Sequence, residues 1–147
     1  MRRTLMIRGG RVLRYGAAAP ELLDIRIGDD GRIADVGPSL PTGDAEVLSL
    51  DGQLVLPGLV DMHQHLDKSR TRALLDNPSG TLMGASAAYR ALAPSITKEQ
   101  MIARARGTVE ACSAHGTVAI RSHTNIDPQT GVRGVEAMVE LRAQCAA

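Results

Sequence analysis

The sequence changes its pattern at Pro57-Gly58, and this change constrains the fold more than any other feature. Up to that point, apolar and polar residues alternate over short segments separated by glycine-containing turns, which is typical of half-buried strands. Beyond it, β-prone segments alternate with longer segments whose apolar residues recur at helical spacing. We therefore expect two structural regions, residues 1–57 and residues 58–147.

Residues 1–57 contain strand signals and no convincing helix. Asp30-Gly31 predicts a hairpin because its turn type needs positive φ, and Gly9-Gly10 and Asp51-Gly52 predict further tight turns. The alternation predicts about six short strands, over residues 4–8, 11–13, 24–28, 32–36, 46–50 and 53–56. We expect a small antiparallel sheet that forms part of a β-sandwich and has a structural role.

Residues 58–147 predict the order strand, loop, helix, strand, helix. Thr97 and Gln100 form a capping box at the start of a helix that ends near Gly116. One apolar face of this helix consists of Met101, Ile102, Ala105, Val109 and Cys112. Strands are expected over 59–65 and from 117, a short helical piece over 85–92, and a second long helix from Val135. This alternation predicts an α/β fold, with parallel strands and helices packed outside them.

Two histidines stand at the end of the first of these strands. Side chains alternate in direction along a strand, so Asp61, His63 and His65 are expected to share one face. Two neighbouring imidazoles can hold one divalent metal ion. His-x-His alone is a weak signal, and structural or surface roles are the alternative. His123 ends the next strand and is expected to face the same cavity, either as a hydrogen-bonding group or as a buried structural residue.

Four other polar residues were considered. Three of them have two possible roles, and the fourth is interpreted as structural. Asp61 could orient a ligand histidine or simply be a polar group at a strand end. Asp67 and Lys68 could line the mouth of the site or form a local surface ion pair. His115 is expected at a helix end, where a cationic side chain suits the helix dipole, and we interpret it as structural.

Composition excludes several classes of function. The net charge of +1 and the dispersed basic residues give no electrostatic case for binding nucleic acid or an anionic membrane. No apolar run approaches the roughly 20 residues needed to span a bilayer, and none follows Arg2-Arg3 that could act as an export signal. We expect a cytoplasmic protein in which Cys112 and Cys145 are buried thiols rather than a disulfide.

Three motifs, taken in order, resemble a known family. Leu56-Pro57-Gly58-Leu59-Val60-Asp61 followed by His63-x-His65 resembles the entry strand of the amidohydrolase superfamily. The segments 63–68, 77–82 and 121–127 are similar to the cytosine deaminase-like branch, which shows His-x-His-Leu-Asp, Ser-Gly-Thr-Leu and an Arg-Thr-His-Val-Asp-like strand. The resemblance implies the first two βα units of a (β/α)₈ (TIM-like) barrel, preceded by part of a small β-sandwich over residues 1–57.

The resemblance also implies a chemistry. His63 and His65 would bind one divalent metal ion, zinc or iron(II), and a metal-activated hydroxide would attack a carbon–nitrogen bond. The substrate would be a small molecule with a cyclic amidine or an aminated nucleobase-like ring, such as an aminated pyrimidine or triazine. His123 would hydrogen-bond in the substrate pocket. The segment 79–82, which ends at Leu82, would cover the substrate in the complete enzyme, although its residues alone indicate an ordinary loop. Asp61 could orient a ligand histidine. Hydrolysis of an N-alkyl amide is the alternative within the superfamily.

The chain departs from the family in its length. A barrel of this kind needs about 250 residues, whereas only about ninety follow Pro57. The family takes its remaining metal ligands and its acid/base groups from later strands, which have no counterpart here. We therefore expect the N-terminal portion of such an enzyme, inactive alone and open to homo-oligomerisation when complete. The alternatives are a non-catalytic fragment or remnant, or a module that pairs with another chain to complete the barrel.

Overall fold

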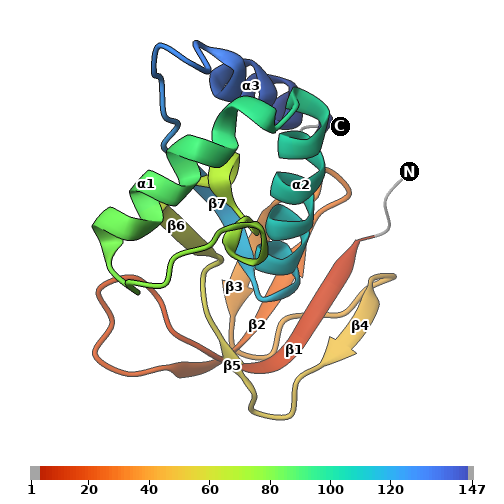
Figure 1. The fold of residues 1–147 in the computed structure, drawn as a ribbon. Coiled ribbons are helices and arrows are strands. Elements are labelled where there is room, and N and C mark those ends of the chain that lie inside the picture. Colours follow the sequence, from red (N-terminus) through yellow and green to blue (C-terminus); the bar gives the residue numbers. More distant parts are fainter. Residues whose placement is uncertain (1–3, 146–147) are drawn as a thin grey trace. The chain divides into compact units, whose positions relative to one another are not determined.

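The computed structural model describes residues 4–145, which divide into two compact units between Pro57 and Gly58 (Figure 1). Among the described residues, the first unit contains strands and no helix, and the second contains two strands and three α-helices. The observed class is therefore mixed α/β, as the sequence predicts. Within residues 4–145, no helix is long and apolar enough to cross a membrane.

The first unit is one five-stranded sheet with the path β3-β2-β1-β4, in which β5 also pairs with β1. Its strands are β1 (Leu5–Val12), β2 (Glu21–Ile27), β3 (Ile33–Gly37), β4 (Glu46–Ser49) and β5 (Leu54–Val55). β1, β2 and β3 are antiparallel neighbours, with Asp30-Gly31 in the predicted turn between β2 and β3. β4 and β5 are parallel to β1, so the prediction of an all-antiparallel sheet is wrong.

The connection between β3 and β4 explains this difference. β3 lies on one side of β2, whereas β4 pairs with β1 on the other side, so residues 38–45 carry the chain across the sheet. Such a crossover returns the chain in parallel, whereas a hairpin returns it antiparallel. Prolines and glycines mark both kinds of connection, so turn signals in the sequence do not distinguish them.

Gly9-Gly10, predicted as a turn, is instead an irregularity inside one continuous strand. Gly9 has φ of 66°, and the register of β1 against β2 shifts between Ile7 and Gly10. A Cβ on Gly10 would lie 2.7 Å from Cγ2 of Val55, so glycine permits the close approach of β5. The Asp51-Gly52 turn lies opposite, since the Gly52 N–H donates to the Gly9 carbonyl (2.8 Å).

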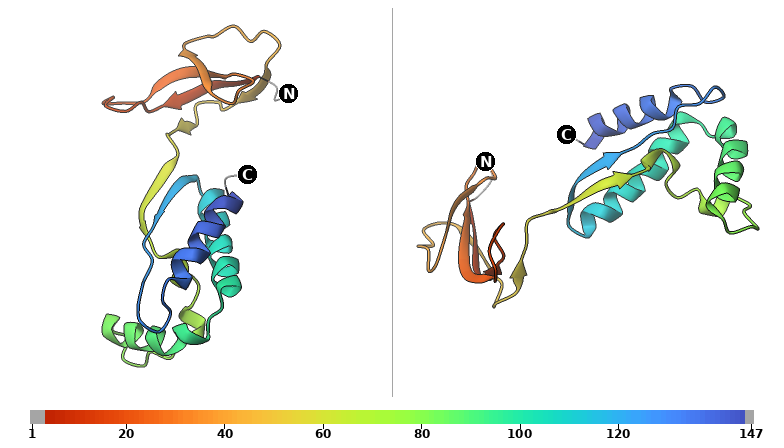
Figure 2. Two further views of the ribbon diagram at one scale, coloured as in Figure 1. Left: turned by 90° about the horizontal axis from the view of Figure 1, so that it is seen from above. Right: turned by 90° about the vertical axis from the view of Figure 1, so that its left-hand side faces the viewer.

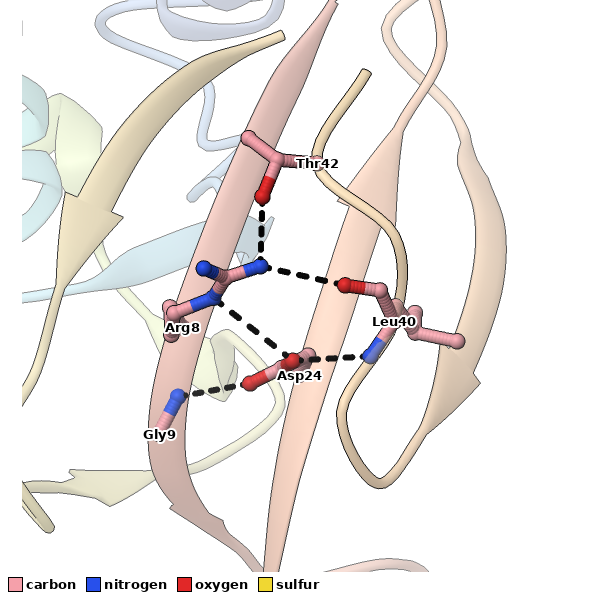
Figure 3. A network of polar contacts seen from close by, with 5 residues as sticks. All are labelled: Arg8, Gly9, Asp24, Leu40 and Thr42. Atoms are coloured by element: carbon pink, nitrogen blue, oxygen red, sulfur yellow. Dashed lines mark hydrogen bonds and ion pairs between the residues drawn. The ribbon is translucent and has the colours of Figure 1, made fainter.

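A buried carboxylate fixes the crossover to the sheet (Figure 3). Asp24 of β2 is 5% exposed and accepts hydrogen bonds from the N–H groups of Gly9 (2.8 Å) and Leu40 (3.0 Å). Nη2 of Arg8 donates to the Leu40 carbonyl (3.0 Å) and to Oγ1 of Thr42 (2.6 Å). Nε of Arg8 lies 3.8 Å from Oδ2 of Asp24, so an ion pair and hydrogen bonds compensate the burial of this carboxylate.

The second unit pairs two parallel strands, β6 (Leu59–Gln64) and β7 (Thr117–Ser122). Three short 3₁₀ turns and two α-helices connect them, and one α-helix follows: η1 (Leu66–Lys68), η2 (Arg72–Leu74), α1 (Leu82–Leu92), η3 (Ala93–Ser95), α2 (Lys98–Ala114) and α3 (Arg133–Cys145). α2 and α3 pack against each other (Figure 2). The predicted parallel strands and their alternation with helices are confirmed.

α2 carries the main apolar contribution to the core of this unit. The predicted capping box of Thr97 and Gln100 starts it, and His115 caps its C-terminus before Gly116, which has φ of 89°. Met101, Ile102 and Ala105 are buried, as their spacing predicts, and they cluster with Leu66, Ile96, Ala137 and Leu141.

Both cysteines are less buried than the sequence predicts. Both are free thiols, and Cys112 is half-buried, but Cys145 is exposed, so the prediction that it is buried is wrong. Cys145 is the last residue of α3 and lines an open groove of about 990 Å³ instead of the core. The same groove is lined by Val118, Ile120, Met138 and Val139.

Candidate functional site

The C-terminal ends of β6 and β7 bring three histidines together. Because the strands are parallel, their ends lie at the same edge of the sheet, with His65 directly after β6 and His123 directly after β7. The ring centroid of His63 lies 5.3 Å from that of His65 and 4.1 Å from that of His123. The structure thus gathers His63, His65 and His123 as the sequence predicts.

The two histidines of the His-x-His motif have the geometry of a ligand pair. Nε2 of His63 and Nε2 of His65 lie 3.4 Å apart. Two nitrogens bound tetrahedrally to one zinc ion at about 2.0–2.1 Å lie about 3.3–3.4 Å from each other. The spacing therefore fits two positions in the coordination shell of a single metal ion.

The other ring nitrogen of His65 fixes which tautomer this residue adopts. Nδ1 of His65 lies 2.9 Å from the carbonyl oxygen of His123. A carbonyl only accepts, so Nδ1 carries the proton and donates it. In the neutral ring, Nε2 is then left with its lone pair directed toward His63. Binding of a metal through Nε2 needs this tautomer.

Asp61 holds the histidines through the main chain rather than through a ring. Its Oδ1 accepts the backbone N–H of His63 (3.0 Å), and its Oδ2 accepts from Nε2 of Gln64 (3.5 Å). The side-chain oxygen of Gln64 in turn accepts the backbone N–H of His65 (3.0 Å). These bonds set the backbone at both histidines, and the bond to an imidazole, one of the two roles considered for Asp61, is not formed.

The pair does not extend to a complete metal site in this part of the chain. Among residues 4–145, no group of three or more His, Cys, Asp or Glu side chains is arranged to hold a metal ion. His63 and His65 therefore fit two ligand positions of a metal whose remaining ligands the described residues do not supply.

Asp67 and Lys68 lie beside the histidines but do not form the local surface ion pair considered above. Asp67 is 3% exposed, and its Oδ2 accepts the backbone N–H of Asn125 (3.1 Å). Nζ of Lys68 donates to Oδ1 of Asn125 (3.1 Å) and lies 5.7 Å from the ring centroid of Tyr89. Both residues thus connect the segment after β6 with the segment after β7.

Tyr89 was not singled out by the sequence. Burial, reinforced by the negative charge of Asp67, raises the pKa of its phenol to about 12. Asn125 and Ser122 were missed as well, although they flank His123 in the third motif. Their position around His123 was the available signal, because residues that follow a strand end line the same edge as the strand's last side chains.

Two further predicted residues lie apart from these hydrogen bonds. Leu82 is the first residue of α1 and is 84% exposed, while Thr81 caps that helix by accepting the Gly84 N–H (3.1 Å). Nδ1 of His115 bonds the Ala111 carbonyl (2.7 Å) at the end of α2, so the structural role predicted for His115 is confirmed.

Comparison with known proteins identifies relatives of this chain. No family model matches the chain. The dihydroorotase of Syntrophotalea carbinolica is 39% identical over 89 residues, which are 60% of this chain and 21% of that protein. The dihydroorotase of Pelotomaculum thermopropionicum is 34% identical over 118 residues, 79% of this chain and 27% of that protein.

Solved structures match almost the entire chain. N-isopropylammelide isopropylaminohydrolase from Burkholderia multivorans has 33% identity and a TM-score of 0.73, over 98% of this chain and 35% of its own. 5-methylcytosine deaminase from Klebsiella pneumoniae has 27% identity and a TM-score of 0.80, over 96% of this chain and 34% of its own. The chain therefore spans about a quarter of the curated relatives and about a third of these structures.

Proposed function

We propose, because the chain has the fold of the N-terminal portion of amidohydrolase-superfamily enzymes, that it is the opening part of a metal-dependent hydrolase of carbon–nitrogen bonds. The resemblance predicted from the three motifs is confirmed, and a deaminase of the predicted branch is among the structural neighbours. The relatives are hydrolases that act on carbon–nitrogen bonds. In this proposal residues 1–57 are the N-terminal portion of a β-sandwich and residues 58–147 begin a truncated (β/α)₈ barrel.

One observation carries the proposal: Nε2 of His63 and Nε2 of His65 lie 3.4 Å apart at the C-terminal edge of a parallel pair of strands. Active sites of such barrels lie at this edge. His63 and His65 would hold one divalent ion, and imidazole ligands suit zinc or iron(II). Such an ion supplies a hydroxide nucleophile near neutral pH by lowering the pKa of a bound water.

The other residues of the site position the histidines or contact the substrate. The Nδ1–H of His65 is held by the His123 carbonyl, so the ring keeps Nε2 free for a metal. Asp61 holds the backbone of His63. The exposed ring of His123 would hydrogen-bond a polar atom of the substrate, and Leu82 would offer an apolar contact. No acid/base group of the reaction is assigned to this chain.

We infer a small-molecule substrate with an aminated pyrimidine or triazine-like ring, processed by a cytosine deaminase type of reaction in the cytoplasm. The fit to a 5-methylcytosine deaminase, with its TM-score of 0.80, supports this class. The alternative is hydrolysis of an N-alkyl amide, supported by the higher identity, 33%, to the isopropylaminohydrolase. A non-catalytic fragment is the other alternative, supported by the two-ligand site. The complete enzyme is open to homo-oligomerisation.

Metal binding by the chain itself tests the central claim. We expect one weak Zn²⁺ site per chain in isothermal titration. His63→Ala and His65→Ala should each weaken binding at least tenfold, or about 1.4 kcal/mol. His115→Ala removes an imidazole that is bonded to a helix carbonyl and should leave the affinity unchanged. Equal affinity in wild type, His63→Ala and His65→Ala would remove the basis of the proposal.

Catalysis separates the candidates. Because residues 4–145 offer only two ligands, the 147-residue chain should release neither ammonia from cytosine nor isopropylamine from N-isopropylammelide. A chimera in which it replaces the matched portion of the Klebsiella deaminase should release ammonia, and the same chimera with His63→Ala should not. Release of isopropylamine instead would favour the alternative class. Turnover by the chain alone at the 1 to 10³ per second typical of enzymes would contradict a half-site.

A further inference from the structure

A buried carboxylate next to the histidines has no role in the scheme above. Asp67 of η1 is 3% exposed, and only one of its oxygens is paired, by the Asn125 N–H. Its Oδ1 is buried without a hydrogen-bond partner among the described residues. A buried carboxylate with an unpaired oxygen is expensive, and an apolar residue would pack there at lower cost.

The bond from Asp67 lies where regular strand pairing stops. β6 ends at Gln64 and β7 at Ser122, so the segments 64–68 and 122–125 are joined by individual hydrogen bonds. The His123 N–H donates to the Gln64 carbonyl (2.7 Å), and the Leu66 N–H donates to Oγ of Ser122 (3.3 Å). Asp67 adds the bond to the backbone beyond His123.

The same segment determines the tautomer of His65. The carbonyl of His123 accepts Nδ1–H of His65. Along the chain this carbonyl lies between two bonded N–H groups, that of His123, which donates to Gln64, and that of Asn125, which donates to Asp67. Fixing the backbone on both sides fixes the direction of this carbonyl. If the Asp67 bond is lost, the His123 carbonyl is held from one side only.

We propose that Asp67 is a positioning residue that, through the Asn125 N–H, holds the His123 carbonyl against Nδ1 of His65 and so keeps Nε2 of His65 available as a metal ligand. The inference deepens the proposed function and rests on it for the metal alone. α3 packs closely against the segments 64–68 and 122–125, since a Cβ on Gly134 would lie 2.7 Å from Cγ2 of Thr124 and 3.7 Å from Cβ of Asp67.

Two replacements at Asp67 separate hydrogen bonding from packing. Asp67→Asn keeps an oxygen that can accept the Asn125 N–H, whereas Asp67→Leu keeps a similar volume without an acceptor. The same replacements at the exposed Asp76 are matched controls. The full 147-residue chain is labelled with ¹⁵N, and the tautomer of His65 is read from its two ring nitrogens at mildly alkaline pH.

In wild type and Asp67→Asn we expect the Nδ1–H tautomer of His65. In Asp67→Leu we expect a substantial share of Nε2–H, with at least tenfold faster amide exchange at Asn125. Zn²⁺ affinity should fall about 10- to 100-fold in Asp67→Leu, as for other residues that orient metal-binding histidines. The Asp76 variants should match wild type in all three measurements.

Two results would overturn the assignment. One is a folded Asp67→Leu protein with the wild-type tautomer and Asn125 exchange. The other is an Asp67→Asn protein as impaired as Asp67→Leu, because the acceptor oxygen would then not matter. If wild type binds no Zn²⁺, the proposed function fails, but the tautomer and exchange measurements still decide the role of Asp67.

Discussion

The two ring nitrogens of His65 have different partners in the candidate site. Nδ1 faces the His123 carbonyl at 2.9 Å, and Nε2 faces His63 at 3.4 Å. The sequence predicted the pair, because two histidines at a strand end follow from spacing alone. It could not predict the Nδ1 bond, whose acceptor is a main-chain atom 58 positions away. Backbone acceptors leave no trace in residue identity.

Replacing Gly134 of α3 tests how tightly the segment after β7 is packed. A Cβ at this position would lie 2.7 Å from Cγ2 of Thr124, a short side chain with little freedom to move. We expect Gly134→Ala to lower the free energy of unfolding by about 1–3 kcal/mol through overpacking. Urea unfolding followed by circular dichroism measures this.

Gly107 in α2 is the matched helical control. Its added Cβ would lie 2.6 Å from Nη1 of Arg70, the far end of a long flexible side chain. Movement of Arg70 and the better helix propensity of alanine, worth up to about 1 kcal/mol, should leave Gly107→Ala near wild-type stability. Equal losses at both glycines would show that the contact at Thr124 is not limiting.

Tyr89 gives a prediction about pH. Because its pKa is raised to about 12 by burial and by Asp67, the fold favours the neutral phenol. Below the usual tyrosine pKa of about 10 this contribution is complete, and it is lost as the pH rises from there through about 12. Absorbance near 295 nm should show a phenol that ionises near pH 12. This step should be absent in Tyr89→Phe, and its persistence in that variant would contradict the prediction.

At the scale of elements, local signals predicted the second unit better than the first. The capping box and the 3.6-residue period of α2 are encoded within a few residues, and the structure contains both. The path of the first sheet depends on whether a loop crosses β1 and β2, which no local signal encodes. A Gly-Gly pair is compatible both with a turn and with an irregularity inside a strand, so the sequence could not distinguish the two at positions 9 and 10.

The cap of α2 is expected to matter more than that of α1. Thr97 accepts the Gln100 N–H at the start of the helix that buries Met101, Ile102 and Ala105. Thr97→Ala should lower the free energy of unfolding by about 1 kcal/mol, and Thr97→Ser should restore most of it. Thr81 caps α1, which buries no residue, so Thr81→Ala should cost less than half as much in the same urea titration. The opposite order would contradict this ranking.

At the scale of the whole molecule, the strands that carry the histidines are unusually open for a parallel pair. Leu59, Val60 and Met62 of β6 and Val118 of β7 are each more than half exposed. Parallel strands are normally covered on both faces, which supports the proposal that further elements of a barrel belong beside them. The sequence predicted missing barrel units from the length remaining after Pro57, and among residues 4–145 no group of three or more His, Cys, Asp or Glu side chains is arranged to hold a metal ion.

The opposed irregularities of the first sheet limit which insertions and deletions it can accept. Between two paired positions, β1 advances three residues, Arg8 to Arg11, while its parallel neighbour advances five, Ser49 to Leu54. The difference of two keeps the alternation of side chains in phase on both strands. Losing or gaining one residue near Asp51-Gly52 would turn every later side chain of β5 to the opposite face. Length variation in this turn should therefore come in pairs of residues, because a change of two restores the facing that a change of one destroys.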